Sequence, residues 1–224
     1  MTFSILGRCA ATGQFGMAVS SSSPAVAARC AHARAGVGAV ASQNVTDPRL
    51  GPAALDQLAA GLDAGAALDA VIGAAEHVEY RQLLIVDRDG NTAIHSGGKS
   101  LGIHTEHAAR DVAAAGNLLA NDTIPRAMVE AFLSSEGHLG DRLITAMRGA
   151  LAAGGEAGPV HSAGMLLVER QDWPLAELRC DWSEDCPIEN ISAAWDVYRP
   201  QMDDYVTRAL DPSAAPSYGV PGDE

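Results

Sequence analysis

Thr2, directly after Met1, is the residue whose type and position most directly suggest catalysis. If Met1 is removed, Thr2 holds a hydroxyl and a free α-amine on one residue. An α-amine has an ordinary pKa of about 7.7–8.0, so a useful fraction of it is neutral at pH 7. The amine can then take the hydroxyl proton and act as the base for its own side chain. Thr2 is therefore a candidate nucleophile, on the condition that the Met1–Thr2 peptide bond is cut.

Two other groups of side chains offer alternative chemistry. The run SSSSP at 20–24 could supply a serine nucleophile, but it lacks a G-x-S-x-G elbow. We expect Ser20 to end a strand and to line the rim of a cleft. His95, His104 and His107 could bind the metal of a hydrolase, although no matching carboxylate or cysteine motif accompanies them. The metal-dependent hydrolase stays open as a second alternative.

The charge of the chain excludes several classes of partner. A net charge of −13 with a single lysine, Lys99, argues against nucleic acid and against an anionic membrane surface. The sequence has no run of 18 apolar residues and no signal peptide pattern, so we expect a cytoplasmic protein. The four cysteines are too few and too scattered for a disulfide framework.

The hydrophobic pattern predicts hairpins and pairs of helices. Residues 2–21 are typical of a hairpin, and residues 36–44 of a buried strand. Leucine spacing predicts two helices within 47–76, with a break near Gly65. Residues 81–97 form the clearest hairpin, with a type I′ turn at Asp89-Gly90. The remaining expected elements are a strand at 109–120, helices at 123–135 and 139–147, a hairpin at 162–183 and a helix near 187–209.

This order of elements favours an α+β fold. Strands come in groups and helices in consecutive pairs, unlike the strict alternation of a Rossmann or TIM fold. Two antiparallel sheets, each covered on its outer face by a helix pair, account for the order. We expect a single domain over residues 1–210. A Pro/Gly/Ser-rich tail at 211–224 is predicted to be mobile.

A threonine-led strand in such a fold is similar to the N-terminal nucleophile (Ntn) hydrolases, which form a four-layer αββα sandwich. More closely, the chain resembles the bacterial and archaeal family named domain of unknown function 1028. The resemblance covers most of residues 1–182. The stretches that carry it are MTFSI (1–5), TGQFGMAVSS (12–21), ARAGVGAVASQNVTDPRLGPAALDQLAAGLDAGAALD (33–69), RQLLIVDRDGNTAIHSG (81–97), AAGNLLA (114–120), AMVEAF (127–132) and HSAGMLLVE (161–169).

The resemblance implies a set of site residues at the ends of the predicted strands. Amide side chains there can donate to an oxyanion, and an arginine can bind a carboxylate bidentately. The alternative is that these groups only satisfy backbone atoms. Val160-His161 departs from the family, where Arg-Gln is commoner. The positions carried over are Thr2, Gln43, Asn44, the Arg81-Gln82 pair, Asn117 and Ser162.

The leading hypothesis is therefore an Ntn-type hydrolase of a carbon–nitrogen bond in a small molecule. Thr2 would attack the carbonyl, and Asn117 or a nearby backbone N–H would hold the oxyanion. This chemistry needs no metal or organic cofactor. Self-association into a homo-oligomer is compatible with the Ala-rich helix faces. The main alternative is a non-catalytic binding or assembly protein on the same scaffold.

Overall fold

The computed structural model describes residues 1–222. Its strands are β1 (Thr2–Arg8), β2 (Phe15–Ser21), β3 (Ala31–Arg34), β4 (Gly38–Asn44), β5 (Arg81–Asp87), β6 (Thr92–Ser96), β7 (Thr105–Ala109), β8 (Val112–Asn117), β9 (Ser162–Val168) and β10 (Ala176–Cys180). Its helices are α1 (Ala27–Cys30), α2 (Leu50–Ala59), α3 (Ala64–Ala74), α4 (Ile124–Ser134), α5 (Leu139–Ala152), α6 (Pro187–Tyr198) and α7 (Met202–Leu210), with short 3₁₀ turns η1 (Val78–Tyr80) and η2 (Arg199–Gln201).

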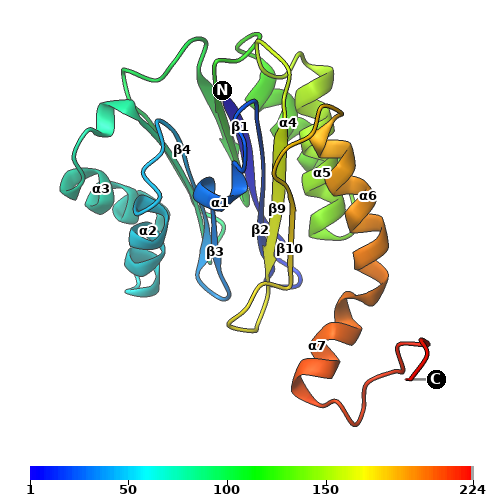
Figure 1. Cartoon of the computed structure of the whole chain (residues 1–224). Helices are drawn as coiled ribbons and strands as arrows, with labels where there is room; N and C mark the ends of the chain where they lie inside the picture. Colours follow the sequence, from blue (N-terminus) through cyan, green and yellow to red (C-terminus); the bar gives the residue numbers. More distant parts are fainter. Residues whose placement is uncertain (223–224) are drawn as a thin grey trace.

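The elements stack in four layers, as Figure 1 shows. A six-stranded sheet has the order β10-β9-β2-β1-β8-β7, and a four-stranded sheet has the order β3-β4-β5-β6. All neighbouring strands are antiparallel. Helices α2 and α3 cover the outer face of the smaller sheet, and α4, α5 and α6 cover that of the larger one (Figure 1). The predicted αββα sandwich is confirmed.

Strand β1 shows how the sequence assigns residues to layers. Successive side chains of a strand point to opposite faces. Phe3 and Ile5 accordingly pack against the helices of the larger sheet, whereas Leu6 packs between the two sheets. A third apolar cluster lies between the smaller sheet and α2–α3. Strands buried on both faces explain the long apolar runs of the sequence.

Small residues allow these layers to approach closely. A Cβ at Gly16 in β2 would lie 2.5 Å from Cδ2 of Leu167, and a Cβ at Gly7 would lie 2.8 Å from the Phe132 ring. These contacts are shorter than van der Waals packing permits, so a larger residue at either position would displace these core side chains. The low aromatic content of the chain matches a core packed from small residues.

The hairpin between β5 and β6 has a turn that differs from the prediction. A type I′ turn needs positive φ at two central residues. Gly90 has a φ of +81°, but Asp89 is not among the described residues with positive φ. The carboxylate of Asp87 accepts hydrogen bonds from the backbone N–H groups of Asp89 and Asn91, each at 2.9 Å. The hydrogen bonds of the Asp87 carboxylate, and not a two-residue type I′ turn, therefore determine the conformation of this loop.

Two edge strands and several boundaries also differ. Strands β3 and β7 were not predicted, because both are short and half-exposed at sheet edges. The strand expected at 109–120 ends at Asn117, since Leu118 has a φ of +51°. The helix break expected near Gly65 lies just before it, where Asp63 caps α3 by accepting from Ala66 N at 2.8 Å. Within the helix expected at 187–209, Pro200 lacks an N–H donor and η2 separates α6 from α7.

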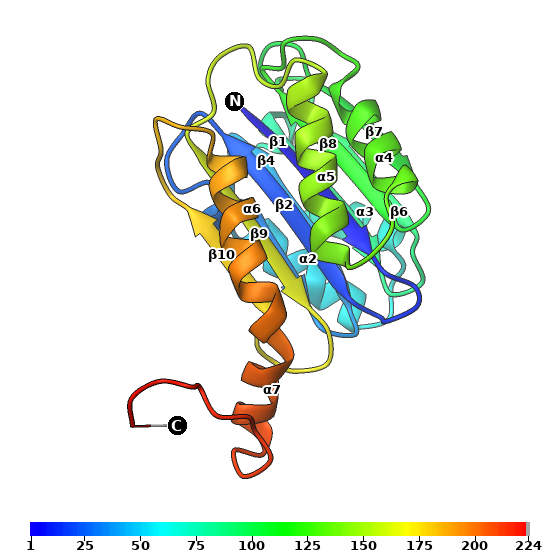
Figure 2. The same ribbon diagram turned by 90° about the vertical axis from the view of Figure 1, so that its right-hand side faces the viewer.

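Residues 199–222, which we call the C-terminal arm, extend away from the sandwich (Figure 2). The Arg208 guanidinium lies 3.9 Å from the Tyr218 ring centroid, so the tail folds back on α7. The mobility of 211–224 stays a prediction, and 223–224 lie outside the described residues. Across residues 1–222, no helix combines the length and apolar character needed to cross a membrane.

Candidate active site

Thr2 faces the space between the two sheets. It alternates in phase with Ser4, whose hydroxyl reaches Gln43 on the opposite sheet, and with Leu6 in the inter-sheet core. On β8, Asn117 is the direct cross-strand partner of Thr2. The N-terminal end of β1 therefore presents Thr2 and Asn117 together at one end of the sandwich.

The hydroxyl of Thr2 is buried and engaged. Thr2 is only 6% exposed, and its Oγ1 lies 2.5 Å from the Met1 carbonyl oxygen and 3.3 Å from Ser21 Oγ. Ser21 Oγ also donates to the Met1 carbonyl and lies 2.8 Å from Ser23 Oγ. While Met1 is in place, its carbonyl thus occupies both hydroxyls. Cutting the Met1–Thr2 bond would release them.

A chain of buried side chains, the amide network (Ser4, Gln43, Gln82 and Asn117), crosses between the sheets. Ser4 donates to Gln43 Oε1 at 2.6 Å, and Gln43 Nε2 donates to Gln82 Oε1 at 3.0 Å. Asn117 Nδ2 donates to the same Gln82 oxygen at 3.1 Å. Gln43 and Gln82 also donate to backbone carbonyls of β8 at 3.2 and 3.1 Å. The network fixes the Asn117 amide beside Thr2.

The two predicted serines tie loops to strands. Ser20 alternates in phase with Ala18, which packs against the helices, so Ser21 and not Ser20 lies beside Thr2. Ser20 Oγ donates to the Ser162 carbonyl at 3.0 Å. Ser162 Oγ donates to the Ser23 carbonyl at 2.6 Å and accepts from Val26 N at 3.2 Å. These bonds hold the loop that follows β2 against Ser162, the first residue of β9.

Asn44 and Arg81 lie opposite each other in the register of β4 and β5. They alternate out of phase with Gln43 and Gln82, so they belong to the other face of the smaller sheet. Asn44 has a φ of +73° and its Nδ2 donates to the Tyr80 carbonyl at 2.5 Å. Arg81 donates to the Val45 carbonyl. These hydrogen bonds shape the loops at this end of the sandwich, and contact with a substrate stays a prediction.

Glu156 is a candidate functional residue that the sequence did not reveal. It is buried, and its Oε2 accepts a hydrogen bond from Ser22 N at 3.1 Å. Its loop is held by a bridge between Leu119 and Glu156 and by a 3.0 Å bond from Ala157 N to the Leu118 carbonyl. An isolated acid in the stretch GGEAG carries no periodicity that would predict burial.

The positive charge of the N-terminal ammonium influences the pKa values of two buried side chains, Glu156 and Cys30. Burial raises the pKa of Glu156 to about 7, against the opposing effects of the terminal ammonium and of the Ser22 N–H. Burial likewise raises the pKa of the Cys30 thiol, and the terminal ammonium again opposes the shift. The terminus therefore lies within electrostatic range of both side chains.

Comparison with known proteins assigns the family. A model described as "Family of unknown function (DUF1028)" matches residues 2–191. The chain belongs to this family. The match confirms the resemblance found in the sequence. A crystal structure of a protein from Silicibacter pomeroyi, also described as DUF1028, is 29% identical, with a TM-score of 0.82 and coverage of 88% of each chain.

Two more distant structures are Anbu proteins. Anbu (ancestral beta-subunit) from Yersinia bercovieri gives a TM-score of 0.40 at 10% identity, and an Anbu mutant from a Hyphomicrobium strain gives 0.41 at 12% identity. Each covers 90% of this DUF1028 chain and 96% of the other chain. With TM-scores below 0.5, they add nothing to the assignment. No curated protein matches the chain.

The histidines of this DUF1028 protein are not gathered into a metal site. His95 Nε2 lies 2.9 Å from the Val78 carbonyl oxygen, and His104 Nδ1 lies 3.1 Å from that of Gly102. Within the part of the chain that the structure describes, no three His, Cys, Asp or Glu side chains come together as metal ligands. His95, His104 and His107 therefore do not form the cluster that the metal-dependent alternative requires.

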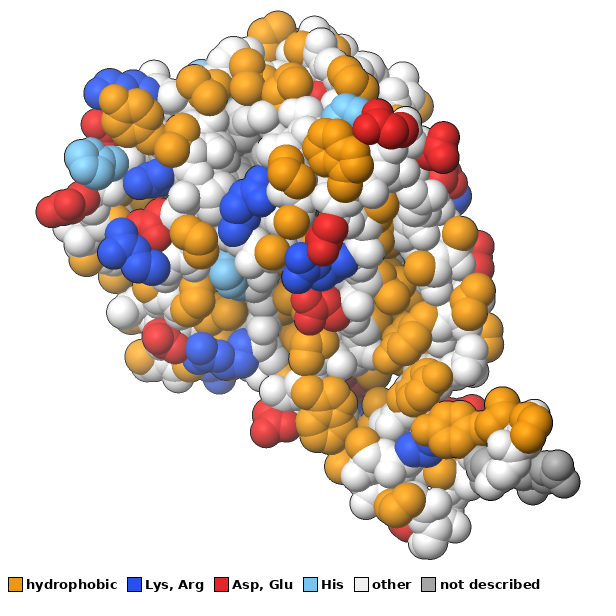
Figure 3. Space-filling model, in the orientation of Figure 1, with side chains coloured by type: hydrophobic (Ala, Val, Ile, Leu, Met, Phe, Trp, Pro, Cys, Tyr) orange, Lys and Arg blue, Asp and Glu red, His pale blue; other side chains and the backbone are white. Residues whose placement is uncertain are grey.

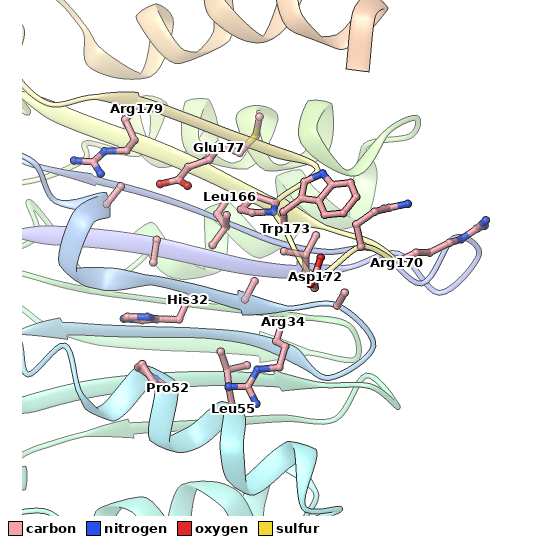
Figure 4. Close-up of a pocket in the computed structure, with 18 residues that line it drawn as sticks. His32, Arg34, Pro52, Leu55, Leu166, Arg170, Asp172, Trp173, Glu177 and Arg179 are labelled. Atoms are coloured by element: carbon pink, nitrogen blue, oxygen red, sulfur yellow. The ribbon is translucent and has the colours of Figure 1, made fainter. Parts of the chain in front are cut away.

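A cavity of about 630 Å³ lies between edge strands β3 and β10 of the DUF1028 sandwich (Figure 4). Figure 4 shows His32 and Arg34 on one side, with Trp173, Glu177 and Arg179 on the other. None of the site residues predicted from the sequence is among the described residues that line it. The groove is thus distinct from the end of the sandwich that holds Thr2.

Proposed function

We propose that this DUF1028 protein hydrolyses a carbon–nitrogen bond of a small molecule, with Thr2 as an N-terminal nucleophile. The observation that carries the proposal is the position of Thr2. Its buried hydroxyl lies between the sheets, beside Ser21 and opposite Asn117, at the first residue of a central strand. An N-terminal threonine placed there carries its own base.

The proposed reaction uses the chain's own groups. After loss of Met1, the Thr2 α-amine takes the Oγ proton while Oγ attacks the substrate carbonyl. An amide NH₂ has two N–H groups. Asn117 gives one to Gln82, so the second can hold the oxyanion, a role worth roughly 10²–10³ in rate. The ammonium then protonates the leaving nitrogen, and water hydrolyses the resulting ester to free Thr2.

The state of Met1 decides the proposal. We expect the native protein to lack Met1 by intact mass spectrometry. A fusion protein cut to expose either Met1 or Thr2 supplies two forms that differ by one residue. The Thr2 form should hydrolyse members of a panel of amides, ureides and cyclic imides, and the Met1 form should not, because an amide nitrogen is not a base. Native protein that uniformly retains Met1 would sink the mechanism and favour the binding or assembly protein.

The proposal includes a cytoplasmic location. All four cysteines are free in the described structure, and unpaired thiols fit a reducing compartment.

We also infer that the C-terminal arm mediates self-association. Figure 3 shows hydrophobic side chains gathered on this protruding segment. Exposed apolar clusters mark interaction surfaces. The exposed residues there and on the adjoining end of α6 are Val197, Tyr205, Leu210, Tyr218 and Val220.

Light scattering after size exclusion tests the arm. Wild-type protein should elute with the mass of an oligomer, and Val197→Glu with Leu210→Glu should lower that mass to one chain. Both side chains are more than 60% exposed, at 68% and 63%, so the fold should be unaffected. Leu133→Glu, at an exposed position on α4, is the matched control and should keep the oligomer. A monomeric wild type would contradict the inference.

A further inference from the structure

Glu156 has a carboxylate oxygen for which the structure supplies no partner. The residue is 5% exposed, and Oε2 is held by Ser22 N. Oε1 is buried and accepts no hydrogen bond from any described residue. A buried acceptor left without a donor destabilises the fold, so such an atom indicates a functional role.

The fold places this oxygen near the start of the chain. The bridge pairs Glu156 with Leu119, which follows Asn117 by two residues. Asn117 is the cross-strand partner of Thr2. A Cβ at Gly158 would lie 3.4 Å from Cε of Met1, so the Met1 side chain lies against this loop. The Ser22 N–H that binds Oε2 follows Ser21, which donates to the Met1 carbonyl. The loop of Glu156 and the end of β2 thus flank the terminus.

We propose that Glu156 is the positioning residue of the Thr2 α-amine, with Oε1 accepting a hydrogen bond from the ammonium once Met1 is removed. The inference rests on the proposed function. Removal of Met1 moves the terminal charge by one residue, about 3.8 Å along the chain, onto Thr2. A carboxylate beside an amine raises the pKa of the amine, which makes it a stronger base for the hydroxyl proton.

Other charged and titratable groups surround Glu156 and the terminus. A cavity of about 320 Å³ beside it is also lined by Glu184, Asp185 and Cys186, from the segment before α6. The Cys30 thiol also lies within electrostatic range of the terminus, and its raised pKa keeps it neutral near pH 7. The Arg29 guanidinium donates to Ser23 Oγ at 2.8 Å, and His161 N donates to the Ser21 carbonyl at 2.8 Å, so a cation and an imidazole also flank this end of the chain. Glu184 accepts a hydrogen bond from Trp182 Nε1 at 3.0 Å. Its side chain is 80% exposed, so its charge is screened by solvent and it is a suitable control acid.

The test follows the titration of the Thr2 amine itself. Protein that starts at Thr2 is labelled with ¹³C-threonine, and the Thr2 signal is assigned by its absence in Thr2→Ser. We expect Glu156→Gln to lower the pKa of the amine by roughly one unit. Glu184→Gln, which removes an equal charge from the same cavity, should leave that pKa in place. The low-pH limb of the hydrolysis profile should move with the amine.

Each outcome decides between the two proposals. An unchanged amine pKa in folded Glu156→Gln would overturn the role of Glu156. If Glu156→Gln does not fold, Glu156→Asp moves the carboxyl back by one methylene and should give a smaller shift in the same direction; no shift there would overturn the role as well. The titration needs no substrate. Equal hydrolysis by wild type and Thr2→Ala would therefore refute the nucleophile but would not affect the measured pKa shift of the Thr2 amine.

Discussion

Thr2→Ala is expected to reduce hydrolysis by the Thr2-starting protein by a factor on the order of 10⁴ or more. Alanine keeps the α-amine and the strand but removes the only atom that forms the acyl intermediate. Ser21 Oγ lies 3.3 Å from Thr2 Oγ1, but it belongs to a residue that has no free α-amine. The loss should fall on kcat and leave KM nearly unchanged, because the covalent bond forms only after binding.

Two further variants separate the nucleophile from its surroundings. Thr2→Ser retains hydroxyl and amine and should keep measurable activity. Ser21→Ala removes the neighbouring hydroxyl and should cost far less than Thr2→Ala, since Ser21 has no free amine. Rates are measured on the best substrate from the amide, ureide and imide panel, with circular dichroism as the check on folding. Activity in Thr2→Ala equal to that of wild type would show that the nucleophile lies elsewhere.

The layered fold could be predicted from hydrophobic periodicity because its central strands are long and apolar. The period of two also determines which side chains share the inter-sheet space. Applied to β2, it separates Ser21, in phase with Val19 of the inter-sheet core, from Ser20. The sequence alone could not show whether Ser20 or Ser21 lies beside Thr2, because this depends on which face of β2 meets the second sheet.

Other features depend on contacts between distant segments. Glu156 is buried by its bridge to Leu119 and by Ser22, and neither contact leaves a local signal. The β5–β6 turn contains the Asp-Gly pair that favours type I′, yet the Asp87 carboxylate determines its conformation. At the turn a side-chain hydrogen bond overrides the local propensity, and at Glu156 contacts with residues distant in the sequence bury the acid.

The amide network also bears on how the site is held. Gln43 was predicted to bind substrate, but its side chain bonds to Ser4, to Gln82 and to a β8 carbonyl. It is fully buried, so each of these bonds forms away from water. Groups buried in a low dielectric are costly to leave unpaired. The geometry thus favours a role in joining the two sheets behind Asn117.

Gln43→Leu is accordingly expected to lower the free energy of unfolding by roughly 2–5 kcal/mol, because it removes the acceptor of the buried Ser4 hydroxyl and the hydrogen bonds that Gln43 donates to Gln82 and to a β8 carbonyl. Gln57→Leu, at a half-buried position on α2, is the matched control and should change stability by less than about 0.5 kcal/mol. Urea denaturation followed by the fluorescence of buried Trp195 measures both.

A double-mutant cycle with Gln82→Leu distinguishes the network from independent contacts. Residues of one hydrogen-bond network couple by about 0.5–3 kcal/mol. Gln82 Oε1 accepts from both Gln43 and Asn117, so once it is gone the loss of Gln43 should cost less than it does alone. Additive effects would contradict the coupling. If Gln43→Leu were as stable as wild type but bound substrate weakly, Gln43 would be a substrate ligand and not a connection between the sheets.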